Sequence, residues 1–439
     1  MSKDSGLGGS GSAPWFKQLH WQIAMGIVFA LIYGIAIRTI WPLAGAADPD
    51  AILAIWNNAA APFAFLGDLF IRALKLIIIP LVVLSVVTGI RNIGDASSLG
   101  KMGLRTVGYY LLTTFLAVLT GLVVVNLIDP GVGLDLGFEA GERIAPKPLS
   151  EVFANMIPKS ALAAFAANDM LPSIFVAILM GVGLLSIGKD GEPLAKLFDS
   201  GNALVLKITN WIMATAPVGV AALFIKTLLD PKLADLASFF TDLGAYMLAV
   251  VMGLGVHAFI LLPLLYKMFV RKSPLAFLHA MAPSLLTAFS TASSSATYPV
   301  TLDCVTERAG VSRKSASFVL PLGATINMDG TALYEAVAAI FIANALGVDL
   351  SLTQQAIVAL TATLAAIGAA GVPSAGLVTM IIVLESVGLP AGAYGLVVAV
   401  DRVLDMCRTT VNVWGDAVGA AVVDATLPEP SVVNKSQDT

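Results

Sequence analysis

The chain has 439 residues, of which 57% are hydrophobic and only 12% are charged. A soluble domain is usually near half apolar and about a quarter charged, so this composition, with a mean hydropathy of +0.87, predicts a membrane protein. The net charge of −4 gives no basic stripe, and no nucleic-acid partner is expected. Two cysteines, Cys304 and Cys407, are too few for a disulfide framework and are expected to be free, packed thiols.

Six continuous apolar stretches are long enough to cross a bilayer, which takes roughly 20 residues. The Gly- and Ser-rich residues 1–14 before them are typical of a disordered tail. The first stretch is expected to be a retained span, because no signal-peptide cleavage pattern follows it. The six stretches are residues 21–41, 62–90, 103–128, 170–187, 204–229 and 243–270.

Four later apolar segments are interrupted in their middles by Gly, Pro, Ser and Asp. A helix facing lipid would leave the freed backbone groups unsatisfied, so these segments are expected inside the protein, beside a polar cavity. They are residues 274–303, 311–346, 352–389 and 391–423.

Basic residues follow alternate spans and place the N-terminus in the cytoplasm. Arg308, Arg313 and Lys314 fall on the same side only if residues 274–303 enter and leave the membrane as a re-entrant hairpin. If the C-terminus is cytoplasmic, the same parity makes residues 352–389 a second hairpin that enters from outside. Two hairpins that meet from opposite sides predict inverted internal symmetry, as in transporters.

The last segment holds five polar side chains spaced by 4, 3, 4 and 4 positions. At about 100° per residue they share one helical stripe, with Thr409 at its edge. A charge at mid-bilayer costs roughly 2.5–3.5 kcal/mol, so the stripe is expected to face a cavity. The alternative is a purely structural ion pair between Asp405 and Arg408, which leaves two carboxylates over. The five residues are Asp401, Asp405, Arg408, Asn412 and Asp416.

The sequence ATINMDGT, residues 324–331, stands in the middle of an apolar segment. Asn, Asp and Gly favour turns, so the helix is expected to unwind here and to present carbonyl groups. Hard cations such as sodium prefer these oxygen ligands, together with carboxylates. Asp329 and the three aspartates of the stripe exceed Arg408 by about three charges, which bound cations would balance. A glycine kink with a satisfied Asn or Asp cap is the alternative.

Weaker signals lie elsewhere. The serine run 293–295 and the sequence GVPSAG, residues 371–376, could form hairpin tips whose half-helices face an anion, or ordinary loops. Tyr110, Thr113 and Thr114 could line a cation site or simply pack. Glu335 could carry a proton or be held in a salt bridge.

An enzyme is not expected, because the sequence shows neither a nucleophile–base pair nor a metal triad. Three scattered histidines are expected at the membrane interface: His20, His257 and His279.

Four motifs between residues 288 and 425 resemble those of the dicarboxylate/amino acid:cation symporter family, which includes archaeal aspartate transporters and mammalian excitatory amino acid transporters. The resemblance covers nearly the whole membrane region, and no long extracellular insertion of the animal type is apparent, which suggests a prokaryotic member. The motifs are SSSATYPVT, LPLGATINMDGTALYEA, IGAAGVPSAGLVTM and DMCRTTVNVWGDAVGA.

The resemblance implies an all-α membrane protein with eight transmembrane helices, two re-entrant hairpins and inverted repeats, working as a homotrimer by an elevator mechanism. It divides the chain into a scaffold (19–100 and 129–236), a moving transport domain (101–128 and 237–426) and cytoplasmic tails (1–18 and 427–439). The expected location is the cell inner membrane, surrounded by lipid, with both termini in the cytoplasm.

The resemblance also implies roles for single residues. Asp405 would bind the substrate amino group and Arg408 its side-chain carboxylate. The rest of the substrate site would be Ser294, Thr331, Gly371, Val372, Gly376, Thr409 and Asn412. A first sodium would lie at Gly323, Asn327, Asn412 and Asp416, a second at Thr325, Ala366, Ile367 and Ala369, and a third at Tyr110, Thr113, Thr114, Asn327 and Asp329.

Single positions narrow the expected substrate and ions. Neutral amino acid exchangers of the family lack an arginine at the position of Arg408, so Arg408 favours an acidic substrate. Bacterial C4-dicarboxylate carriers lack an aspartate at the position of Asp405, so Asp405 favours an amino acid. Together they predict that this chain carries glutamate or aspartate. Glu335 resembles the mammalian proton-carrying glutamate and predicts co-transport of a proton with sodium. Ala292 and Met406 stand where archaeal and mammalian members, respectively, carry an arginine, which leaves potassium counter-transport open.

Two other functions fit parts of this pattern. One is a proton-coupled glutamate or C4-dicarboxylate carrier without sodium dependence. The other is a channel or membrane sensor that uses the same polar site for gating. Concentrative uptake, and its dependence on sodium, would distinguish them.

Overall fold

The computed structural model describes residues 19–43, 46–91, 100–134, 154, 156–167, 169–233, 235–368 and 375–427, and within these ranges it contains helices and no strands. Among the described residues, six helical stretches are long and apolar enough to cross a membrane. Leucine, isoleucine and phenylalanine side chains are exposed along five of them, as lipid-facing surfaces require, whereas the apolar part of the sixth, Arg313–Ala345, is buried inside the protein. These findings confirm the predicted all-helical membrane class. The predicted tail 1–18 and all but Leu427 of the tail 427–439 lie outside the described residues.

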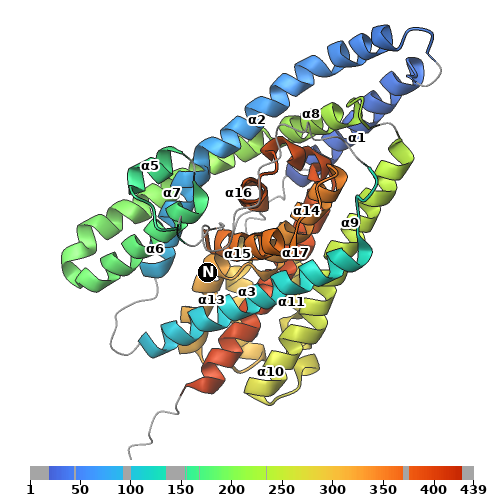
Figure 1. Cartoon of the computed structure of the whole chain (residues 1–439). Coiled ribbons are helices and arrows are strands. Elements are labelled where there is room, and N and C mark those ends of the chain that lie inside the picture. The colour runs from blue at the N-terminus through green and yellow to red at the C-terminus, as the bar shows by residue number, and fades with distance from the viewer. Residues whose placement is uncertain are drawn as a thin grey trace, which may run out of the picture.

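One group of helices packs around the long helix α2 (Figure 1). Helix α2 has 43 residues and is therefore about 65 Å long, well beyond the single predicted span 62–90. The short helix α5 (Ala161–Ala166) contacts α6. This outer group contains α1 (Leu19–Ile40), α2 (Pro49–Arg91), α6 (Met170–Ile187), α7 (Glu192–Ala214) and α8 (Ala216–Leu228).

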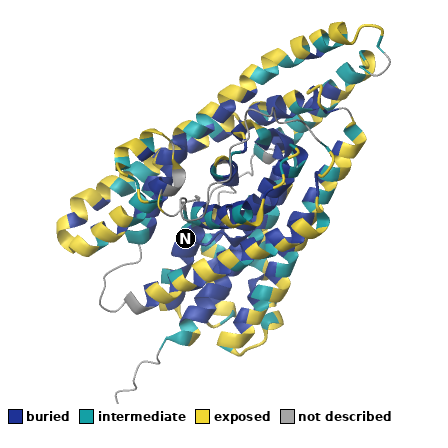
Figure 2. Cartoon of the chain, viewed as in Figure 1, coloured by how far each residue is buried: buried dark blue, intermediate teal, exposed yellow. Residues whose placement is uncertain are grey.

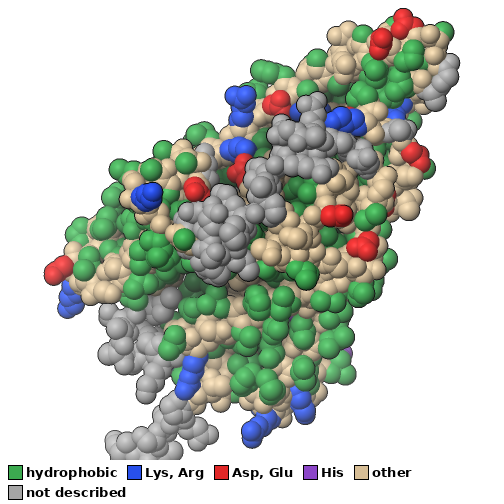
Figure 3. Space-filling view, in the orientation of Figure 1, with side chains coloured by type: hydrophobic (Ala, Val, Ile, Leu, Met, Phe, Trp, Pro, Cys, Tyr) green, Lys and Arg blue, Asp and Glu red, His purple; other side chains and the backbone are tan. Residues whose placement is uncertain are grey.

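The second group surrounds α14 and α17 and forms the inner part of the molecule. Figure 2 shows both helices buried, whereas exposed residues line the outer faces of α9 and α10. Figure 3 shows hydrophobic side chains over much of the visible surface of this group. The inner group contains α3 (Gly100–Ile128), α9 (Leu236–Val256), α10 (Leu262–Val270), α11 (Pro274–Thr291), α12 (Ser294–Asp303), α13 (Arg313–Ile326), α14 (Asp329–Ala345), α15 (Leu352–Gly368), α16 (Ala375–Ser386) and α17 (Val398–Thr426).

Helices end where the sequence carries breaking residues. The predicted span 204–229 is in fact two helices, because Pro217 lacks an N–H and Thr215 bonds its hydroxyl to the Ile212 carbonyl. The predicted span 243–270 begins earlier, at Leu236, where Asp235 caps the helix, and contains a π-helical turn, η3 (His257–Leu261). Helices α11 and α12 meet at Ala292, whose φ of 49° is left-handed.

Candidate functional site

The stripe predicted on α17 is buried and brings two carboxylates to one arginine. Arg408 donates from Nη1 to Asp401 over 3.0 Å and from Nη2 to Asp405 over 2.8 Å. Its guanidinium carbon lies 3.8 Å from the centre of the Tyr334 ring, a cation–π distance. The Asp405–Arg408 ion pair considered from the sequence is therefore present. Arg408 also pairs with Asp401, so the three side chains form one cluster.

A second arginine, Arg402, reaches the same cluster and was not identified from the sequence. Its Nη1 lies 3.3 Å from Oδ2 of Asp405. Arg402 is off the stripe, but a long arginine side chain at i, i+3 can reach back to a carboxylate on it. Four aspartates are thus matched by two guanidinium groups, so the expected surplus of three negative charges becomes two.

The remaining described residues of the predicted substrate site surround this cluster. Thr331 accepts a hydrogen bond of 3.2 Å from the amide of Asn412. Gly376 is the second residue of α16, and a Cβ there would stand 3.3 Å from the guanidinium carbon of Arg408. Thr409 is buried on α17, and Ser294 is the buried first residue of α12, a helix that packs on α17. Gly371 and Val372 lie outside the described residues.

The predicted interruption of the 311–346 segment occurs at Asn327 and Met328, between α13 and α14. Both residues have non-helical backbone angles, which frees carbonyl groups at the end of α13. The Gly330 N–H donates to Oδ1 of Asn412 over 2.8 Å and ties the break to α17. The break is therefore held by side chains of a neighbouring helix.

Asp416 meets this break at the first predicted sodium site. Asn327 donates from Nδ2 to Oδ1 of Asp416 over 2.9 Å. Gly323 lies so close that a Cβ there would be 2.3 Å from the same oxygen. Asn412 is one turn away on α17. Three predicted ligands therefore meet here, with carboxylate, amide and carbonyl oxygens of the kind a hard cation takes, whereas the side chain of Asn412 bonds Gly330 and Thr331.

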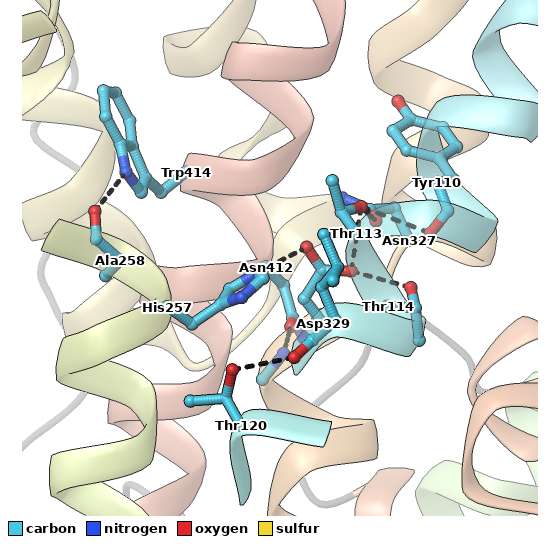
Figure 4. Close-up of polar contacts among 12 residues, drawn as sticks. Tyr110, Thr113, Thr114, Thr120, His257, Ala258, Asn327, Asp329, Asn412 and Trp414 are labelled. Atoms are coloured by element: carbon cyan, nitrogen blue, oxygen red, sulfur yellow. Dashed lines mark hydrogen bonds and ion pairs between the residues drawn. The ribbon is translucent and has the colours of Figure 1, made fainter. Parts of the chain in front are cut away.

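Asp329 lies at the centre of the third predicted sodium site (Figure 4). Its Oδ1 accepts hydrogen bonds from Thr114 over 2.7 Å and from Thr113 over 3.3 Å. Thr113 is also 3.4 Å from the side-chain oxygen of Asn327. The phenol of Tyr110 instead donates to the Val319 carbonyl over 2.9 Å, so its hydroxyl points to α13 and not to Asp329.

His257 faces the other oxygen of Asp329, which corrects its predicted place at the membrane interface. It is fully buried, and its Nε2 lies 3.0 Å from Oδ2 of Asp329. Ala258, in the same π-helical turn, accepts a hydrogen bond of 3.0 Å from the indole of Trp414 on α17. An ionisable residue in the middle of an apolar span was the available signal, since such residues are usually functional. His279 is exposed, and the side chain of His20 is outside the described residues.

Three residues of the second predicted sodium site fall in the last turns of α13 and α15. Thr325 is in the last turn of α13, and Ala366 and Ile367 are in the last turn of α15. The two helices pack on each other, and their final carbonyl groups have no partner within the helix. The fourth expected ligand, Ala369, lies outside the described residues.

Glu335 is buried between α14 and α16. Thr379 donates its hydroxyl to Oε1 of Glu335, whereas Oε2 is buried without a hydrogen-bond partner in the described part of the chain. No ion pair to Glu335 occurs among the described residues, where a salt bridge was the alternative expectation. Both cysteines are free, as expected.

Known proteins resemble this chain over most of its length. The chain matches the sodium:dicarboxylate symporter family over residues 19–426. It is 37% identical to excitatory amino acid transporter 3 of Mus musculus, over 93% of this chain and 86% of the mouse protein. It is 40% identical to the Homo sapiens protein of the same name, over 82% of this chain and 79% of the human protein. It is 38% identical to excitatory amino acid transporter 1 of Ambystoma tigrinum, over 82% and 77% of the two chains. The protein therefore belongs to the sodium:dicarboxylate symporter family, whose members are multi-pass membrane transporters and not enzymes.

Proposed function

We propose that the protein imports glutamate or aspartate by symport with sodium and a proton. The observation that carries this proposal is the buried contact between Asp405 and Arg408. An amino acid with an acidic side chain has an ammonium group and a side-chain carboxylate. The ammonium can take the place of the Arg408 guanidinium at Asp405, and the carboxylate can take the place of the Asp405 carboxylate at Arg408. The names of the relatives, excitatory amino acid transporters, support the same substrates.

Asp329 and Asp416 support sodium coupling. Neither carboxylate has a guanidinium partner in the described part of the chain. Asp329 lies against the hydroxyls of Thr113 and Thr114 and the imidazole of His257, and Asp416 lies against the side-chain amide of Asn327. Up to three sodium ions would occupy the three predicted sites. The proton would travel on Glu335, whose buried carboxyl is bonded to the Thr379 hydroxyl and to no cation among the described residues.

The packing into two groups supports an elevator. We propose a scaffold of residues 19–100 and 129–236 and a transport domain of residues 101–128 and 237–426 that moves against it. Eight spans and two re-entrant hairpins with inverted symmetry would make up each protomer of a homotrimer. Both termini would face the cytoplasm, in the cell inner membrane.

Uptake into proteoliposomes tests this function when sodium, proton and potassium gradients are varied independently. We expect concentrative uptake of aspartate and glutamate that requires sodium and is enhanced by an inward proton gradient. Undiminished uptake without sodium would instead support a proton-coupled glutamate or C4-dicarboxylate carrier. Failure to concentrate substrate would support a channel or sensor.

A further inference from the structure

Arg402 contacts the residue proposed to bind the substrate amino group, yet nothing in the proposed mechanism uses it. Its Nη1 lies 3.3 Å from Oδ2 of Asp405, while Arg408 holds Oδ1 at 2.8 Å. Each oxygen of this one carboxylate therefore faces a different guanidinium group.

The two guanidinium groups are held unequally. The side chain of Arg408 is 1% exposed, pairs with Asp401 as well and lies against Tyr334. The side chain of Arg402 is 12% exposed, and its one ion pair among the described residues, with Asp405, is the longer contact at 3.3 Å. Arg402 is thus the more easily displaced partner of Asp405, because fewer and longer interactions hold it.

We propose that Arg402 sets how strongly the pocket distinguishes amino acids from plain dicarboxylates. Its guanidinium occupies Oδ2 of Asp405 and gives way to a substrate ammonium. A substrate without an amino group leaves Arg402 in place, so that Asp405 remains neutralised. This inference rests on the proposed function, in which Asp405 binds the amino group.

The charges give the expected direction for loss of Arg402. Without its guanidinium, Asp405 is free of one competitor, so a ligand with an ammonium binds more tightly. A dicarboxylate without an ammonium then meets an under-compensated carboxylate and binds more weakly, because unpaired buried charge is unfavourable. Both effects raise the preference for the amino acid.

The experiment compares L-aspartate with succinate, which differs by the amino group alone. Dissociation constants are measured at saturating sodium for the purified wild type, Arg402→Gln, Arg402→Lys and the control Arg313→Gln. Arg313 is an exposed arginine in the first turn of α13. We expect the ratio of the succinate to the aspartate constant to rise about tenfold in Arg402→Gln, to rise less in Arg402→Lys, and to stay unchanged in the control.

An unchanged or lower ratio in Arg402→Gln overturns the inference, as does equal weakening of both ligands, which would indicate a merely structural role. Arg402→Met replaces the glutamine variant if that variant does not fold, because it keeps side-chain length without charge. The wild type alone decides the proposed function, since it must bind aspartate in a sodium-dependent way. A wild type that does so beside a variant with an unchanged ratio refutes only the role of Arg402.

Discussion

His257 and Asp329 form a fully buried pair, with Nε2 of the imidazole 3.0 Å from Oδ2 of the carboxylate. The other oxygen of Asp329 is bonded to Thr113 and Thr114 on α3. The carboxylate therefore joins three elements that are far apart in the sequence, namely α3, η3 and α14. Outer partners of this kind orient metal ligands and are often as important as the ligands themselves.

Replacement of His257 is expected to weaken sodium coupling. His257→Leu removes the group that faces Oδ2, so apparent sodium affinity should fall about 10-fold to 100-fold, the usual effect of losing an outer-shell partner. His257→Gln keeps a hydrogen-bond donor for Asp329 and should lose less sodium affinity. The sodium dependence of aspartate uptake measures both. Equal losses in the two variants would show that the site needs imidazole shape and not the hydrogen bond.

Loss of the Asp416 charge is expected to have a similar effect at the first sodium site. Asp416→Asn keeps the shape of the side chain beside Asn327 but removes the charge that attracts a cation. Half-saturating sodium should rise at least about tenfold, because charged hydrogen-bonded groups contribute roughly 1.5–3 kcal/mol. Asp424→Asn is the control, since Asp424 lies further along α17 and bonds Ser312. A wild-type sodium curve for Asp416→Asn would contradict the site.

An ion pair joins the two groups of helices. Lys75 of α2 lies 2.5 Å from Glu385 of α16, and both side chains are partly exposed. If the inner group moves against the outer one, this pair must break. Glu385→Lys should change the initial uptake rate by up to about fivefold, the scale of an exposed pair, and the additional change Lys75→Glu should restore it.

The pair between Lys226 and Asp68 serves as the control, because both residues lie within the outer group. Charge reversal there should leave the uptake rate unchanged. A double variant of Lys75 and Glu385 whose uptake rate remains that of Glu385→Lys would mean that the pair has no role in movement.

Glu335 provides a test of proton coupling. Glu335→Gln removes the carboxyl while an amide can still bond Thr379. We expect uptake that still requires sodium but no longer responds to an inward proton gradient. Glu307→Gln, at an exposed position, should keep the wild-type response. Continued acceleration by the proton gradient in Glu335→Gln would assign the proton to another group.

Close packing between α2 and α8 gives a stability prediction. A Cβ at Gly219 would stand 2.3 Å from Cγ of the Phe70 ring, so Gly219→Ala should cost about 1–3 kcal/mol, as overpacking does. The thermal midpoint in detergent should fall. Gly244→Ala, where nothing lies within 4 Å of the new Cβ, should not lower it.

Several features follow from the sequence alone because they depend on local chemistry. Composition predicts a membrane protein, since too few charged residues are present for a water-soluble surface. The spacing on α17 predicts a buried polar stripe, since helical geometry fixes which side chains share a face. Asn327 and Ser293 mark a helix break and a helix start through their own backbone preferences.

The partners of these groups were decided only by tertiary structure. His257 and Asp329 are 72 positions apart, and no local pattern reveals that a π-helical turn aims the imidazole at the carboxylate. Arg402 was not predicted as a site residue because its position on the helix lies off the stripe. Only its long side chain reaches Asp405. Local sequence determines which charges lie within apolar segments and must be buried inside the protein, whereas the packing of distant helices determines which opposite charge or hydrogen bond stabilises each of them.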